Sequence, residues 1–277
     1  MNTRHSRLAK ITRSAGIVLF GLVASAAMVG CASSGGDSAS GSPDPEGAII
    51  GVMIDHTCDA TDDMIKWGEE VVNKGVAVAA KDSGTFFGEA VTTAEYQDGA
   101  ADVAWQFSTD EKGSGPQKRD LEFQAEELLE SSEVQELLTP TPGDCGSDLM
   151  GAVATLSESI GDEPMADTRS KDVVFVTNGI VIDEERGWNF IEDDITPVYI
   201  DDVIEAMKKE GTFPDLSGAS LQLLGLGDRE PDIRAEKKGQ IKKFWETFAA
   251  ESGVLPEDYK ALNNSKQVRL PFNSSGD

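Results

Sequence analysis

The sequence predicts an α/β fold, with a mostly parallel central sheet flanked by helices on both faces. Runs typical of strands alternate with runs of helical spacing through most of the chain, and this alternation is typical of three-layer, Rossmann-like folds. The run AIIGVMI at 48–54 is apolar apart from one glycine, as expected of a strand that is covered on both faces. In such a sheet, ligands bind in a crevice at the carboxyl ends of the strands.

The first thirty residues predict an export signal. Four cations precede an apolar run over Ala15–Val29, which is shorter than the roughly 20 residues needed to span a bilayer. The run ends in MVGC at 28–31, which resembles the lipobox of bacterial lipoproteins. We therefore expect Cys31 to carry the lipid and to hold the exported, outward-facing protein at the cell membrane, with no other membrane contact. An ordinary secretory signal cut nearby is the alternative.

Three segments are therefore expected, namely a signal peptide at 1–30, a linker at 31–47 and a domain at 48–277. The linker is rich in Ser, Gly, Asp and Pro and has no large apolar residue, so it cannot form a core and should be flexible. Loss of the signal removes four cations and no acids, which changes the net charge from −26 to −30. Such a surface repels phosphate backbones, so nucleic acid is not an expected partner.

The first half of the domain predicts two helices and two further strands. Helical spacing of apolar residues after the first strand predicts a helix capped by Thr61 or Asp62. Strands are expected over 85–93 and 102–107, paired antiparallel around an Asp-Gly turn. A surface helix follows over 117–138, and two prolines end it.

The second half continues the alternation. We expect a helix with Ser147 as its N-cap, and a closing helix over 233–252 that Gly253 stops. Between them, strands are expected over 172–177 and 221–226 with a short helix over 201–210. The tail, 255–277, is assigned only a packing role.

The tryptophans and one acidic run allow predictions of which side chains are buried and which are exposed. Trp67 and Trp245 fall on apolar helix faces and are expected in the core. Trp188 lies in the polar stretch EERGWNF and is the best candidate for an exposed contact residue. The acidic run at 192–194 is interpreted as solvated surface.

Several kinds of catalytic site are excluded by what the sequence lacks. His56 is the only histidine once the signal is removed, which excludes zinc sites with several imidazoles. The chain contains no GxxxxGK[ST] or GxGxxG phosphate loop and no GxSxG nucleophile motif. We expect no catalytic residues and no enzyme activity.

Three polar clusters follow predicted strands or open a predicted helix. They are DHTCD at 55–59, CGSDL at 145–149 and TNG at 177–179. Together they offer carboxylate, hydroxyl and amide oxygens, which are hard ligands suited to Mg²⁺ or Ca²⁺.

With these clusters, the chain resembles the von Willebrand factor A-like family. The metal-ion-dependent adhesion site of that family uses Asp-x-Ser-x-Ser after the first strand, a Thr that opens a later helix, and Thr-Asp-Gly after the fourth strand. The matching stretches are DHTCD, GSDL and TNG, and the stretch PDLSGASLQLLGLG at 214–227 resembles a later strand of bacterial envelope members. The resemblance covers roughly residues 48–254.

The resemblance implies a ligand set, residue by residue. Asp55, Thr57 and Ser147 match without a change of ligand type, whereas Asp59 stands in place of a Ser and Asn178 in place of the final Asp. The implied site holds a divalent cation, Mg²⁺ or Ca²⁺, on the first four of these, with Asn178 in the outer shell. A remnant pocket that binds nothing is the alternative.

The resemblance also implies a disulfide. Once Cys31 is lipidated, two cysteines remain in an exported and oxidising setting, Cys58 and Cys145. Each belongs to one of the two loops that the family fold brings side by side. Two separate free thiols are the alternative.

The function implied is a lipid-anchored cell-envelope binding or adhesion module, whose partner is an envelope or extracellular protein. One alternative is a solute-binding lipoprotein of a transport system, which needs a crevice between two lobes. Another is a hydrolase that uses a metal-bound water, for which the sequence offers only Asp or Glu as base.

Overall fold

The structure is a computed structural model that describes residues 47–55, 61–81, 83–91, 102–108, 117–139, 148–227 and 233–272. All of them belong to one unit of the chain, Pro43–Asp277. The main sheet has six strands in the order β3-β2-β1-β4-β7-β8. Their bounds are Ile49–Asp55 (β1), Thr85–Val91 (β2), Asp102–Gln106 (β3), Lys171–Val176 (β4), Ala219–Leu224 (β7) and Tyr259–Leu262 (β8).

Pairing in this sheet is parallel except at one edge. β1 pairs in parallel with β2 on one side and β4 on the other, and β7 and β8 continue in parallel beyond β4. β3 pairs antiparallel with β2. The predicted α/β class and the antiparallel pair are therefore confirmed. A separate antiparallel hairpin joins β5 (Ile182–Asp183) to β6 (Trp188–Asn189).

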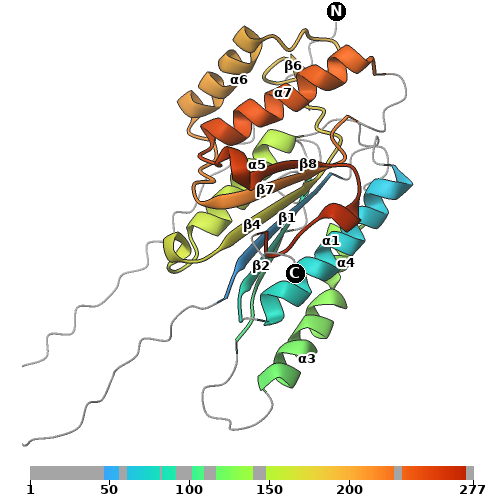
Figure 1. Cartoon of the computed structure of the whole chain (residues 1–277), viewed down its shortest axis with the longest axis vertical. Coiled ribbons are helices and arrows are strands. Elements are labelled where there is room, and N and C mark those ends of the chain that lie inside the picture. Colours follow the sequence, from blue (N-terminus) through green and yellow to red (C-terminus); the bar gives the residue numbers. More distant parts are fainter. Residues whose placement is uncertain are drawn as a thin grey trace, which may run out of the picture. The chain divides into compact units, whose positions relative to one another are not determined.

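Helices cover both faces of the sheet (Figure 1). The chain winds outward from β1 to one edge and then from β4 to the other, so right-handed crossovers place the helices of the two halves on opposite faces. One face carries α1 (Asp62–Lys81), α3 (Gln117–Leu129) and α4 (Ser132–Leu137), and the other carries α5 (Leu149–Gly161), α6 (Pro197–Glu210) and α7 (Ala235–Glu251). Single 3-10 turns lie at Ala166–Thr168, Pro256–Asp258 and Ser265–Gln267. The described helices include none that is both long enough and apolar enough to cross a bilayer.

The core has two layers because residues of each strand alternate between the faces. Ile50, Val52 and Ile54 of β1 pack toward α1, whereas Ile49 and Met53 pack toward α5. Each large apolar side chain buried in this way contributes about 1.5–3 kcal/mol.

Aromatic rings fill much of the α7 side. Trp245 is fully buried, with its ring centroid 5.5 Å from that of Phe244 and 6.2 Å from that of Phe175. Trp67 is also buried, under the other face. The prediction that both tryptophans belong to the core is confirmed.

The predicted helix over 117–138 is interrupted. α3 ends at Leu129, and Ser131 caps α4 by accepting a hydrogen bond from the Val134 N–H at 3.3 Å. A Ser that can bond the backbone in this way starts a new helix rather than continuing the old one.

The tail, predicted only to pack against the domain, also contributes a strand to the sheet. Tyr259–Leu262 forms β8, a sixth strand alongside β7, and Val268 and Leu270 are buried against the α1 face.

The prediction that Trp188 is an exposed contact residue is wrong. Its side chain is only 8% exposed and packs within the core on the α5 side.

Candidate functional site

The strand order reverses between β1 and β4, and this point carries a buried polar contact. Asp55 ends β1 and is 1% exposed, and Thr177 follows β4 directly and is fully buried. The Thr177 hydroxyl donates a hydrogen bond to Oδ2 of Asp55 at 2.9 Å. In open α/β sheets this switch point, at the carboxyl ends of the strands, is where ligands bind.

The Thr177 hydroxyl is itself held in place by the backbone. Its oxygen accepts a hydrogen bond from the N–H of Gly179 at 2.9 Å. With its oxygen occupied by that donor, the hydroxyl proton is directed to Asp55. Thr177 therefore orients the Asp55 carboxylate. It belongs to the TNG cluster that the sequence singled out, but only Asn178 of that cluster was expected in the ligand set.

The rest of this loop is pinned from two sides. Asn178 is 4% exposed, and its Oδ1 accepts from the Ile180 N–H at 2.8 Å, while its backbone oxygen accepts from Gly227 at 3.0 Å. The indole N–H of Trp245 donates to the Gly179 carbonyl at 3.0 Å. Gly179 has φ of +76°, and a Cβ there would lie 2.4 Å from Leu226. A rigid loop of this kind holds its polar groups in fixed positions without a ligand.

The amino end of α5 reaches the same edge of the sheet. Ile160, near the carboxyl end of α5, packs against Gly51, near the start of β1. α5 therefore runs antiparallel to β1. The twelve residues back to Asp148 rise about 18 Å along the helix, against about 13 Å from Gly51 to Asp55 along the strand. Asp148 lies at or just beyond the carboxyl end of β1.

Asp148, rather than Ser147, is the N-cap of α5. Its Oδ1 accepts from the Gly151 N–H at 2.9 Å, which is the bond that a capping carboxylate makes with the third helical residue. The prediction that Ser147 is the cap is wrong for this reason. Burial raises the pKa of Asp148, while the Gly151 N–H and the positive charge of Arg186 act in the opposite direction.

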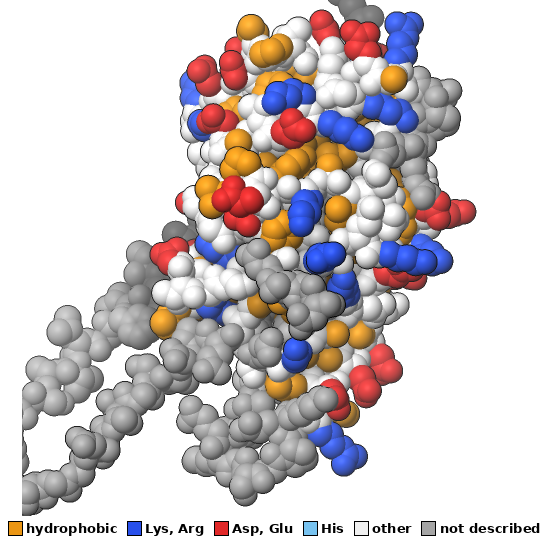
Figure 2. All heavy atoms as spheres, viewed as in Figure 1, with side chains coloured by type: hydrophobic (Ala, Val, Ile, Leu, Met, Phe, Trp, Pro, Cys, Tyr) orange, Lys and Arg blue, Asp and Glu red, His pale blue; other side chains and the backbone are white. Residues whose placement is uncertain are grey.

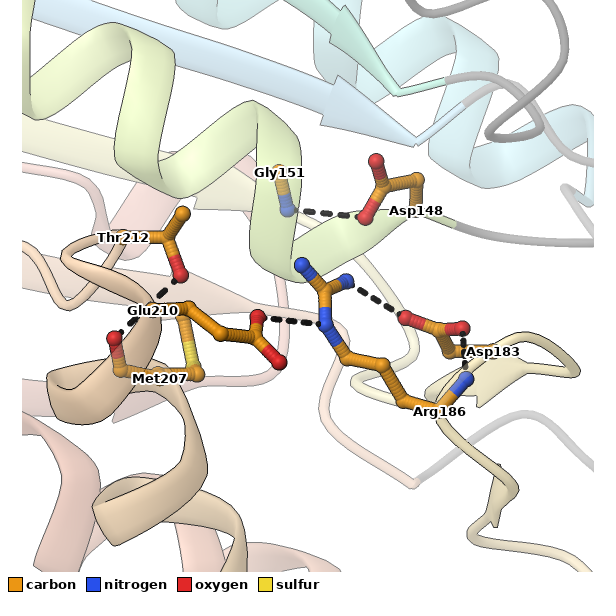
Figure 3. Close-up of polar contacts among 7 residues, drawn as sticks. All are labelled: Asp148, Gly151, Asp183, Arg186, Met207, Glu210 and Thr212. Atoms are coloured by element: carbon orange, nitrogen blue, oxygen red, sulfur yellow. Dashed lines mark hydrogen bonds and ion pairs between the residues drawn. The ribbon is translucent and has the colours of Figure 1, made fainter.

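Arg186 connects the β5–β6 hairpin with α6. Its Nη1 bonds Oδ2 of Asp183 at 2.6 Å, and its Nε bonds Oε2 of Glu210 at 2.9 Å. Figure 3 shows the guanidinium lying between these two carboxylates, with its free end toward the start of α5. The Trp188 ring lies beneath it at 5.3 Å. These contacts explain why Trp188 is buried, since it supports the arginine that fixes the hairpin.

Only some of the ligands predicted from the sequence lie among the residues that the structure describes. Asp55 ends β1, and Asn178 follows the end of the neighbouring strand β4, so both lie at the same edge of the sheet. Thr57, Asp59 and Ser147 lie outside the described residues, as do Cys31, Cys58 and Cys145. Their predicted roles in metal binding, lipidation and the disulfide therefore stay predictions.

The chemistry at this edge is that of oxygen donors. Asp55, Thr177 and Asp148 present carboxylate and hydroxyl oxygens, which fit a hard cation such as Mg²⁺ or Ca²⁺. Within the described ranges, no three acidic, histidine or cysteine side chains are grouped closely enough to hold a metal ion. A complete shell would thus need ligands from 56–60 or 140–147, where the sequence places Thr57, Asp59 and Ser147.

A groove of about 650 Å³ lies away from this edge. It runs between the exposed side of α5 and the segment that joins α6 to β7. Its lining includes Thr155, Glu158, Asp167, Lys171 and Asp215. Lys171 begins β4, so the groove extends toward the amino ends of the strands.

Comparison with models of known protein families finds no match to this chain, and comparison with curated proteins finds no similar sequence.

Proposed function

We propose that this chain is an exported, lipid-anchored protein of the cell envelope, whose domain is of the von Willebrand factor A-like type and binds a protein partner. One observation carries the proposal, namely the contact at 2.9 Å between Asp55 and Thr177 at the point where the strand order reverses. The sheet order and the antiparallel edge strand are compatible with this assignment.

The binding face is the carboxyl edge of the sheet. Asp55 supplies a buried carboxylate, Thr177 fixes its orientation, and Asp148 adds a second carboxylate at the start of α5. A divalent cation held by Asp55 with Thr57, Asp59 and Ser147 would give a partner's acidic side chain a direct ligand position. Asn178 belongs to the surrounding loop, where its oxygen is bonded to Ile180.

A binding role fits the described architecture better than the alternatives. The described residues form one main sheet and a short hairpin, not two lobes that could close on a solute. A hydrolase would need a base beside the reacting atoms, and the Asp55 carboxylate already accepts the Thr177 hydroxyl.

The cation is tested by thermal unfolding in EDTA, in Mg²⁺ and in Ca²⁺. A ligand that binds only the native state at about a hundred times its Kd stabilises it by about 2.7 kcal/mol, so the melting temperature should rise with the cation. Asp55→Ala should abolish the rise, whereas Asp167→Asn, an exposed carboxylate at the far end of the strands, should keep it. Equal curves in EDTA and in millimolar cation for the wild type would remove the cation from the proposal.

The anchor and the disulfide have separate tests. Cys31→Ser should move the protein from the membrane fraction to the soluble fraction of cells. Peptide mapping without reduction should recover a cross-linked peptide that contains Cys58 and Cys145.

A further inference from the structure

The end of the described chain crosses the α1 face of the sheet as a short strap, residues 268–272. Gln222, fully buried in β7, bonds the backbone of Arg269 twice, through Nε2 to its oxygen at 2.7 Å and through Oε1 from its N–H at 2.9 Å. Oδ1 of Asp172 accepts the N–H of Phe272 at 3.1 Å. Buried polar side chains thus hold the strap at both ends.

Cations surround this strap. The Lys260 ammonium lies 4.2 Å from the centroid of the Phe272 ring, and the Lys74 ammonium donates to the backbone oxygen of Val268. The exposed Arg269 lies within the strap, and the exposed Lys266 precedes it. Lys260 pairs across the sheet with Gln222, the residue that holds Arg269, so these charges are neighbours.

The positive charges of this strap outnumber the two carboxylates bonded at it, those of Glu70, which accepts from the Ser265 hydroxyl, and Asp172. In the part of the chain that the structure describes, none of the four cations forms an ion pair with a carboxylate. Burial lowers the pKa of Lys74, and the positive charge of Arg269 lowers it further. Figure 2 shows blue side chains gathered over the middle of this face, where Figure 1 places β8 and the red end of the chain.

This surface has the opposite sign to the protein, whose net charge is −26. Charges further apart than about 8 Å are largely screened at physiological ionic strength, so a ligand at the strap is influenced by the nearby cations more than by the distant acids. A flat anionic membrane would instead bring many carboxylates of the surrounding surface against its headgroups. The surface therefore favours a narrow anionic ligand.

We propose that the strap and its four cations, Lys74, Lys260, Lys266 and Arg269, form a docking surface for an extended acidic segment of a partner protein. The segment lies along the strap, with its carboxylates beside the ammonium and guanidinium groups. This surface is separate from the carboxyl edge, because the strap ends on Asp172 near the start of β4. The proposal holds whether or not the edge binds a cation.

The test measures binding of a fluorescent peptide of alternating Glu and Ser to the full chain by anisotropy at physiological ionic strength, where the distant acids are screened. The same peptide with Gln in place of Glu is the neutral control. Lys260→Gln with Arg269→Gln should weaken binding of the acidic peptide about five- to tenfold, as expected for two lost surface charge contacts. Lys208→Gln with Lys243→Gln removes equal charge where each cation pairs with a glutamate, and should change binding by less than about twofold.

Further measurements keep the proposal falsifiable. Arg269→Lys retains the charge and should bind as the wild type does, and salt at about 1 M should weaken binding. Equal weakening in the two double variants would overturn the proposal, because it would show that the net charge of the protein sets the affinity and the position of the cations does not. So would failure of the wild type to bind at physiological ionic strength, or tighter binding to phosphatidylglycerol vesicles than to the peptide.

Discussion

The two edges of the sheet bury polar groups in different ways. At the amino edge, all three guanidinium nitrogens of Arg169 donate inward, to the Gly47 carbonyl at 2.7 Å, to Glu163 at 2.9 Å and to the Thr85 hydroxyl at 2.9 Å. Thr85 completes the network by donating to Glu163 at 2.9 Å. At the carboxyl edge, Asp55 instead accepts from the Thr177 hydroxyl, which in turn accepts from the backbone N–H of Gly179.

This difference is consistent with a stabilising role for the amino edge and with the binding role proposed for the carboxyl edge. The amino-edge network joins four segments of the chain through one cation, and each nitrogen of the Arg169 guanidinium donates to an acceptor within the protein. Such a network fixes the fold and turns its cation inward. At the carboxyl edge, the contact between Thr177 and Asp55 joins a neutral hydroxyl to the carboxylate and involves no cation.

The largest expected effect is at the amino edge. Arg169→Ala removes the donor of the Gly47 carbonyl and the cationic partner of Glu163, which keeps only the Thr85 hydroxyl as a donor, and loss of one partner of a buried ion pair costs about 3–5 kcal/mol. Urea unfolding should measure this loss. Lys208→Ala instead breaks an ion pair with Glu251 in which both side chains are about half-exposed, 46% and 51%, so it should cost no more than about 1 kcal/mol. Equal losses would show that the amino edge is not specially cooperative.

The next effect tests the rigidity of the carboxyl-edge loop. Gly179→Ala should destabilise the fold by about 2–4 kcal/mol, from backbone strain and from overlap with the Leu226 and Trp245 side chains. Gly211→Ala is a matched control, since Gly211 has the same φ of +76° but open space around it. Unfolding free energies that differ by less than about 1 kcal/mol between the two variants would contradict a tightly packed loop.

A smaller effect is expected at the carboxylate itself. Asp55→Asn keeps an oxygen that can accept from Thr177 but loses the charge, so the apo protein should lose about 1–2 kcal/mol. Thr177→Val removes the donor with little change of shape. A double-mutant cycle of Thr177→Val with Asp55→Ala, which removes the acceptor, should give a coupling of about 1 kcal/mol, and additivity would mean that this bond does not contribute to stability.

The smallest effect is pH dependence at the start of α5. Because the folded-state pKa of Asp148 is raised, the folded state binds the proton more tightly, and stability falls as pH rises through that pKa. Asn caps a helix about as well as Asp, so Asp148→Asn should match the wild type in acid and exceed it at neutral pH by less than about 1 kcal/mol. Denaturant unfolding at acidic and neutral pH measures this difference. A variant that is less stable at neutral pH would indicate that the ionised Asp148 has a favourable partner there.

Much of the sheet could be predicted because its strands are short apolar runs that end at polar residues. β1 ends at Asp55 where the apolar run stops, and Thr61 accepts a hydrogen bond from Met64 at the start of α1, as expected of its cap. β8 was missed because YKAL is short and half-exposed, so that its pairing with β7 leaves little hydrophobic signal. The break at Ser131 was missed because the Leu and Glu spacing continues across it.

The candidate site could be located but not assembled from sequence. Asp55 and Asn178 were found because strand ends in such a sheet carry its ligands. The bond from Thr177 to Asp55 joins residues 122 positions apart, and only the register of β1 against β4 brings them together. The contacts of Arg186 were also missed. The stretch EERGWNF has the composition of an exposed loop, and only the structure shows that Arg186 pairs with Asp183 and Glu210.

The central place of β1 has a mechanical consequence. The strand enters the sheet just after Gly47, whose carbonyl Arg169 holds, and it is bonded along its length to β2 and β4. If force pulled the preceding chain while a partner bound beyond Asp55 resisted it, the hydrogen bonds from β1 to β2 and to β4 would be loaded in shear. Many of these hydrogen bonds would then have to break together. Under tension, β1 would therefore transmit force directly from the preceding chain to the partner.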